Sequence, residues 1–139
     1  GGRIRLGARC EIGAGVVLAT YGGEIVLGDD CSVNPFSVLY GHGGLHIGRG
    51  VRIAAQCVVV PANHVFKDPD EFIFRQGLTQ EGIVIEDDVW LGAGVTVVDG
   101  VRIRRGCVIA AGAVVTASTD SFGVYCGVPA RMLRKRSGT

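Results

Sequence analysis

The stretch IEDDVWLGAGVTVVDGVRIRRGCVIAAGAVV, residues 85–115, carries a repeat of six residues. An aliphatic residue returns at each sixth position, and a second, mostly smaller apolar residue follows it four positions later. A helix would need apolar spacings of three and four, so this period indicates one short strand and one turn per hexapeptide. The first set is Ile85, Leu91, Val97, Ile103, Ile109 and Val115, and the second is Val89, Val95, Val101, Cys107 and Ala113.

The N-terminal half carries the same repeat with two insertions, at Tyr21–Gly23 and around Gly41–Gly44. Strands this short cannot bury themselves, so they are expected to stack as successive turns of a solenoid. Three hexapeptides form one triangular coil, and the register positions of both halves therefore predict an all-β parallel β-helix of about five coils. The N-terminal positions are Leu6, Ile12, Leu18, Leu27, Val33, Leu39, Ile47, Ile53 and Val59.

Composition limits the class of protein. The 139 residues are 47% hydrophobic with a formal net charge of +1, which predicts one domain over residues 1–139 and no nucleic-acid partner. No signal peptide or long apolar run is visible, so no integral membrane segment is expected. Five cysteines without a CxxC pair indicate reduced thiols in a cytoplasmic protein. Four of them, at inward small positions, are expected to be buried: Cys10, Cys31, Cys57 and Cys107.

The repeat stops after His64, within the stretch VVVPANHVFKDPDEFIFRQG of residues 58–77, and returns at Ile85. Solenoids accept insertions as loops that leave one face, often the binding face. We therefore expect a projecting loop over about residues 65–82, with His64 on the last strand before it. A rigid coil would hold this histidine in place beneath the loop.

Several segments together resemble the left-handed parallel β-helix acyltransferases, and most closely the maltose, galactoside and polysaccharide O-acetyltransferases. The resemblance covers nearly the whole chain and implies a left-handed coil, acetyl-CoA as co-substrate and a homotrimer with sites between subunits. It also implies transfer of acetyl to a hydroxyl of a sugar or surface polysaccharide acceptor. The segments are DVWLGA (88–93), AGAVVT (111–116) and GVPAR (127–131), together with the break after His64.

The resemblance implies catalytic roles for His64 and Asn34. The pKa of histidine lies near neutral pH, so His64 suits the general base that takes the proton of an attacking hydroxyl. Asn34 could stabilise an oxyanion or hold the acceptor, or it could serve only the turn before Pro35. Candidates to orient the imidazole are the acidic residues of the loop (Asp68, Asp70 and Glu71) or a main-chain carbonyl.

The resemblance also implies a donor site along the coil. Coenzyme A has a long pantetheine arm, which needs small residues where it approaches the backbone, and phosphates, which arginines can pair. The tail over about 121–139 is expected to contain a short helix beginning near Pro129. The predicted cofactor-binding residues are Trp90, Gly92, Ala93, Ala111, Thr116, Arg131 and Arg134.

Other functions stay open. The same donor residues would serve N-acetylation of an amino sugar or nucleotide-linked amino sugar, inactivation of an antibiotic, or a non-catalytic binding scaffold. A histidine-bound zinc, as in the γ-type carbonic anhydrases, would need three histidines, and the chain has His42, His46 and His64. Their spacing inverts the order of that family, so no metal is expected.

Overall fold

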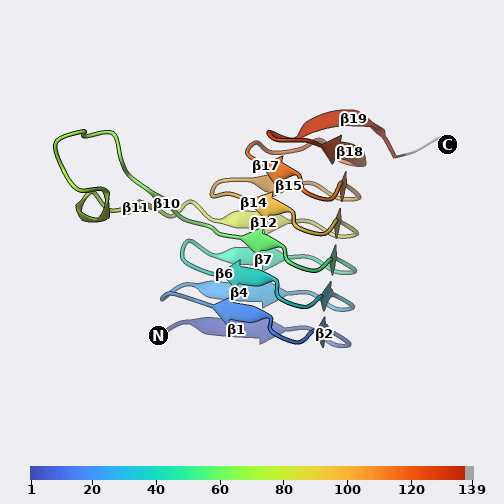
Figure 1. The fold of residues 1–139 in the computed structure, drawn as a ribbon. Helices are drawn as coiled ribbons and strands as arrows, with labels where there is room; N and C mark the ends of the chain where they lie inside the picture. Colours follow the sequence, from blue (N-terminus) through green and yellow to red (C-terminus); the bar gives the residue numbers. More distant parts are fainter. Residues whose placement is uncertain (137–139) are drawn as a thin grey trace.

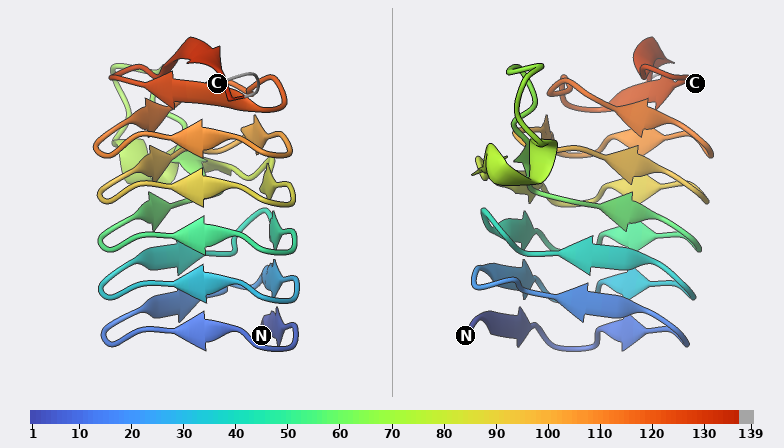
Figure 2. Two further views of the ribbon diagram at one scale, coloured as in Figure 1. Left: turned by 90° about the vertical axis from the view of Figure 1, so that its right-hand side faces the viewer. Right: turned by 60° about the vertical axis from the view of Figure 1, so that its left-hand side comes forward.

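A computed structural model describes residues 1–136 and shows a left-handed parallel β-helix of five triangular coils (Figure 1). The coils stack from the N-terminus upward, and each contributes one strand to each of three parallel sheets (Figure 2). We call these sheets faces A, B and C. The predicted fold class and number of coils are therefore confirmed.

Short strands make up each face, in the order in which they hydrogen-bond. Face A contains β1 (Arg3–Leu6), β4 (Glu24–Leu27), β7 (Leu45–Ile47), β12 (Ile83–Ile85) and β15 (Arg102–Ile103). Face B contains β2 (Glu11–Ile12), β5 (Ser32–Val33), β8 (Arg52–Ile53), β13 (Trp90–Leu91), β16 (Val108–Ile109), β18 (Gly123–Cys126) and β19 (Arg131–Lys135). Face C contains β3 (Val17–Ala19), β6 (Val38–Tyr40), β9 (Val58–Val59), β14 (Thr96–Val97) and β17 (Val114–Val115).

The aliphatic residues of the hexapeptides form ladders inside the prism. Leu39 pairs with Val59, and Leu91 lies between Ile53 and Ile109, so each residue covers its counterpart in the next coil. From coil 2 onward every predicted aliphatic position is at most 3% exposed. In coil 1, Leu6 remains 45% exposed, because no coil lies beneath it in the described structure. The thiols of Cys31, Cys57 and Cys107 are buried and free, whereas Cys10 is half-buried.

The break after His64 is an antiparallel hairpin that extends outward from the stack (Figure 1). Its strands are β10 (Asn63–His64) and β11 (Leu78–Thr79), and its loop contains one turn of 3₁₀-helix, η1 (Ile73–Arg75). Asp99 anchors the returning strand: its carboxylate accepts hydrogen bonds from the Thr79 hydroxyl at 3.1 Å and from the main-chain N–H groups of Glu81 and Gly82. The hairpin is therefore tied to the coil that follows it.

The prediction of a C-terminal helix is wrong, because the tail forms β18 and β19. Strand β18 continues face B in parallel with β16, and β19 returns antiparallel to it. Residues of β18 alternate between buried and half-buried, the period of a strand. A strand supplies partners for the main-chain groups at the open edge of β16, which a helix would leave unpaired. Within residues 1–136 no helix is long and apolar enough to cross a membrane.

Candidate functional site

His64 lies at the base of the hairpin, at the corner where the chain passes from face C to face A. Its side chain is exposed, and it lines a hollow of about 300 Å³ together with residues from coils 1 to 3. The coil and the pairing of His64 with Leu78 fix its backbone. The other lining residues are Tyr21, Tyr40, His42, Val60, Ala62, Asn63 and Leu78.

The acidic residues of the loop do not orient His64 in the described chain. The Asp68 carboxylate accepts a hydrogen bond from the N–H of Asp70 at 3.0 Å, and that of Glu71 accepts one from the N–H of Phe72 and pairs with Arg75. These carboxylates therefore organise the loop itself. Within residues 1–136 the imidazole of His64 has no hydrogen-bond partner.

Asn34 lies at a different corner, in the turn between face B and face C of coil 2. Its side chain is exposed, and its main-chain N–H donates to the carbonyl of Ile53 at 2.9 Å. Face C separates this corner from the one that carries His64. The two predicted catalytic residues therefore do not meet within one chain, and a common site would require a second subunit.

Most of the predicted donor-binding residues lie on face B or at the corner between faces B and C. Trp90 projects from face B and is 54% exposed, beside Arg52 and Val108 of the neighbouring coils. Ala93 and Ala111 are exposed in successive turns at the corner, where the carbonyl of Ala93 accepts from the N–H of Gly112. These residues form a small-residue edge along two coils.

Three predicted donor residues lie away from the small-residue edge. Arg131 and Arg134 are exposed on β19, at the top of face B. Thr116 is exposed at the corner after β17, on the opposite edge of face C from Ala111. The structure thus groups the arginines with face B and separates Thr116 from the small-residue edge.

Gly92 is buried, and its smallness has a packing reason. A Cβ at this position would lie 2.6 Å from the main-chain nitrogen of Ala111 in the next coil. The glycine is therefore required by the close approach of coils 4 and 5. Its contact with a donor stays a prediction.

The sequence did not predict that three aromatic residues lie beside His64, although it offered His42 as a zinc ligand. The rings of Tyr21 and His42 are stacked with centroids 4.4 Å apart, and Tyr40 meets Tyr21 edge-on at 4.8 Å. Tyr21 and His42 belong to the two insertions that interrupt the repeat, so the irregular spacing was the signal that could have identified them.

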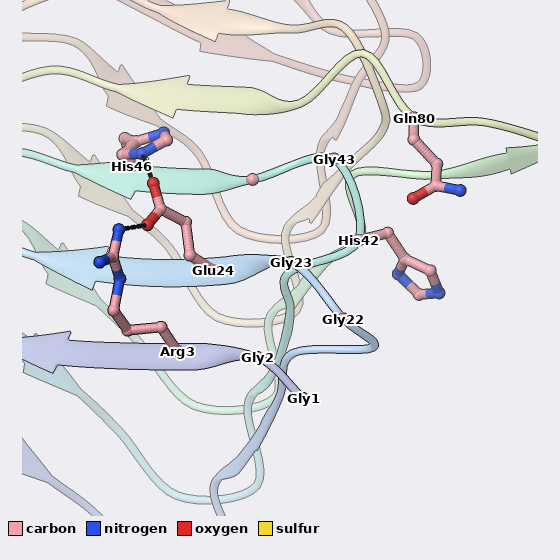
Figure 3. A pocket seen from close by; sticks show the side chains of 11 residues that line it. Gly1, Gly2, Arg3, Gly22, Gly23, Glu24, His42, Gly43, His46 and Gln80 are labelled. Atoms are coloured by element: carbon pink, nitrogen blue, oxygen red, sulfur yellow. Dashed lines mark hydrogen bonds and ion pairs between the residues drawn. The ribbon is translucent and has the colours of Figure 1, made fainter.

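A larger hollow of about 690 Å³ lies next to this corner, on the lower part of face A (Figure 3). Glycines form its floor, and the Glu24 carboxylate stands at one side between Arg3 and His46. Arg3 donates to Glu24 at 2.7 Å, and the His46 Nε2 lies 2.7 Å from the other carboxylate oxygen. These hydrogen bonds, with that of Arg3 the larger influence, lower the pKa of Glu24 below its usual 4.5.

The three histidines do not converge on a zinc site in the described chain. His46 is paired with Glu24 on face A, His42 is stacked on Tyr21, and His64 lies on the hairpin. No cluster of three potential metal ligands forms within residues 1–136. The described chain by itself therefore holds no three-histidine site.

Comparisons with known proteins agree with the fold and the repeat. A family model described as bacterial transferase hexapeptide (six repeats) matches residues 82–117. The Escherichia coli K12 protein WbbJ, named as a lipopolysaccharide biosynthesis O-acetyl transferase, is 32% identical over 96% of this chain and 72% of its own length. A Mycobacterium tuberculosis protein named as an acetyltransferase is 29% identical over 96% of this chain, which spans only 42% of that relative.

Solved structures show the same coil. The maltose O-acetyltransferase of Clostridium difficile 630 is 25% identical with a TM-score of 0.84, covering 95% of this chain and 69% of that one. A hexapeptide-repeat acetyltransferase of Vibrio cholerae O1 biovar eltor, solved with acetyl-CoA, is 26% identical with a TM-score of 0.72, covering 96% of this chain and 72% of that one. From its repeat, its coil and its likeness to WbbJ, the chain belongs to the bacterial hexapeptide-repeat transferases.

Proposed function

We propose that the chain transfers acetyl from acetyl-CoA to a hydroxyl group of a sugar or polysaccharide, with His64 as the general base. The observation that carries this proposal is the placement of His64: an exposed histidine, held by a rigid coil and hairpin, in a hollow open to an acceptor. The names of WbbJ and of the clostridial neighbour support a hydroxyl acceptor.

In the proposed reaction an acceptor hydroxyl attacks the thioester carbonyl while the free imidazole nitrogen of His64 takes its proton. The carbon–sulfur bond then breaks, and the proton is returned to the departing thiolate of CoA. A histidine suits both steps because its pKa lies near neutral pH.

We propose acetyl-CoA as the donor because the Vibrio cholerae neighbour was solved with it. The exposed edge made by Ala93 and Ala111 carries only small side chains, so it would admit the pantetheine arm beside Trp90. Arg131 and Arg134, exposed on β19, would pair the phosphates of CoA.

We propose that the active molecule is a trimer whose sites lie between subunits. His64 and the small-residue edge occupy opposite corners of face C, so the base of one chain would serve the donor edge of its neighbour. The outer surface of face C supports this arrangement, because it carries a ladder without charged side chains. That ladder consists of Val17, Val38, Val58, Thr96 and Val114, which pair coil by coil.

Face A contrasts with this ladder and makes face C the better candidate for association. Its outer surface carries Glu24, His46, Glu86 and Arg102, with ion pairs between Arg3 and Glu24 and between Arg102 and Glu86. Interface cores are depleted of charged residues. Sedimentation should give about three times the protomer mass of 14.5 kDa. Val58→Glu would place a charge in the interface, so this variant should sediment with the mass of a single protomer.

The decisive experiment measures CoA release from acetyl-CoA with a panel of sugars, polysaccharides and amino sugars. His64→Ala should lower acceptor-dependent release by roughly a hundredfold or more. The control is His46→Ala, assayed with monosaccharide acceptors, because His46 is an exposed histidine of face A that does not line the hollow of His64. Full activity in His64→Ala would show that another group is the base. Release with amino sugars alone would show N-acetylation.

A further inference from the structure

The corner beside His64 holds three aromatic rings from two coils. Tyr21 follows coil 1, and Tyr40 and His42 end coil 2, each at the point where the chain passes from face C to face A. The rings of Tyr21 and His42 are nearly parallel, at 13°, and that of Tyr40 lies 5.7 Å from His42. We call these three residues the aromatic platform.

We propose that the aromatic platform binds the acceptor by stacking on the flat face of a pyranose ring and so presents a hydroxyl to His64. This inference rests on the proposed function and identifies the acceptor as an uncharged, hydroxyl-bearing ring. The platform and His64 line one hollow of about 300 Å³, at the lower end of the volumes that hold small ligands. The reacting group and the binding surface are therefore adjacent.

The platform combines apolar ring faces with one unpartnered polar atom. Tyr21 is 58% exposed, so a ligand can reach its ring. His42 makes no side-chain hydrogen bond within residues 1–136, and its Nδ1 is shielded from solvent without a partner. A buried polar atom without a partner costs stability and calls for an explanation, and a role toward a ligand is one. Sugars match such a surface, because they offer C–H groups on one face and hydroxyls at the edge.

Tyr21 also differs from the other aromatic residues that take the left-handed backbone conformation. Tyr21, Phe36 and Phe122 all have positive φ values, of 46°, 64° and 59°. Phe36 and Phe122 lie over Gly15 and Gly106 of the coils below, so they pack those corners. Tyr21 instead stacks on the ring of His42 in the next coil. Tyr21 therefore packs on a residue that lines the hollow, rather than on a glycine of the coil below.

The lining of the hollow favours a hydroxyl over an amine. Among the described residues that line it there is no aspartate or glutamate: its apolar side comes from Val60, Ala62 and Leu78. An ammonium group would enter without a counter-charge, whereas a neutral sugar needs none. His42 also lines the larger hollow of Figure 3, and its ring stands with Gln80 on the side of that hollow away from Glu24. A sugar on the platform could therefore be one unit of a longer glycan.

The test compares Tyr21→Ala with Tyr21→Phe, using acetyl-CoA and methyl hexopyranosides as acceptors. Tyr21→Ala should raise the KM for the pyranoside roughly tenfold, and leave kcat and the KM for acetyl-CoA within about threefold. Tyr21→Phe keeps the ring and should behave as the wild type. The matched control is Phe122→Ala, which removes another exposed aromatic at positive φ far from the hollow. An unchanged KM for the pyranoside in Tyr21→Ala would refute the proposed binding role of the aromatic platform.

A binding measurement separates failure of the platform from failure of the proposed function. Saturation-transfer NMR with methyl α-D-glucopyranoside and maltose should show transfer to the sugar ring protons in wild type and in His64→Ala, and loss of transfer in Tyr21→Ala. Transfer that survives Tyr21→Ala refutes the platform even where His64 proves to be the base. If His64→Ala keeps full turnover while Tyr21→Ala loses sugar binding, the base assignment fails and the platform stands. Absence of transfer with the wild type refutes the platform whatever the activity.

Discussion

Replacing Gly92 by alanine should destabilise the protein because there is no room for a Cβ between coils 4 and 5. The added carbon would lie 2.6 Å from the nitrogen and 3.0 Å from the Cα of Ala111, and 3.0 Å from the carbonyl oxygen of Ile109. All three atoms belong to the backbone, so no side chain can turn away. Ordinary contact begins near 3.4 Å, so the two coils must separate locally by about 0.8 Å.

That separation would break the hydrogen bonds that join the coils at this corner. The N–H of Gly92 donates to Ile109 at 2.8 Å, and the N–H of Gly112 donates to Ala93 at 2.9 Å. Lengthened by about 0.8 Å, both would fall outside hydrogen-bond distance. Two such bonds, with the strain of the displaced strands, correspond to about 2–4 kcal/mol in the free energy of unfolding.

Gly94→Ala is the matched control, because it changes conformation without a clash. Gly94 has a φ of +69°, and a Cβ there would have no heavy atom within 4 Å. Gly94→Ala should lower the free energy of unfolding by about 1 kcal/mol, which is the cost of holding one alanine in the left-handed backbone conformation. Urea unfolding followed by the fluorescence of Trp90, at one fixed protomer concentration, measures both variants. A Gly92→Ala protein that is as stable as Gly94→Ala would refute the packing argument.

Three further predictions concern other parts of the molecule. Asp99→Ala should free the returning strand of the hairpin and speed proteolysis of the loop over residues 65–77, because two main-chain N–H groups lose their acceptor. Asp99→Asn keeps an acceptor oxygen, so its loop should be cut more slowly than that of Asp99→Ala. The hydrogen bond from Arg102, and a weaker one from the N–H of Arg105, lower the pKa of Glu86 below 4.5. Its stabilising contribution is present above about pH 4.5 and is lost as the pH falls through the lowered pKa, so Glu86→Gln should flatten the acid side of a stability–pH curve. Burial raises the pKa of the Cys57 thiol, so it should resist alkylation at pH 8 until urea unfolds the protein, whereas the half-buried Cys10 and Cys126 should react in the folded protein. Equal rates for all three would contradict the assigned burial.

The coil could be predicted from the sequence because each hexapeptide repeats the same local solution. Leu91, Val97 and Ile103 each lie on the inner side of a different face. The six-residue spacing that places them there is visible without any long-range information. The tail could not be predicted in this way. Pro129 after a glycine suggests the start of a helix, but the open edge of β16 pairs with β18 and imposes a strand, and that edge exists only once the coils have stacked.

The site was harder to predict than the coil for a related reason. A repeat shows which residues face inward. Functional residues face outward or lie at corners, and the six-residue spacing carries least information about those positions. His64 was predicted as a site residue because the repeat breaks beside it, and the same reasoning applies to Tyr21 and His42, which belong to the two shorter insertions. All three breaks occur at the corner between faces C and A, in consecutive coils, so the stack places them together. In a solenoid, insertions that fall at the same corner of neighbouring coils therefore indicate one site, even where each insertion is only a few residues long.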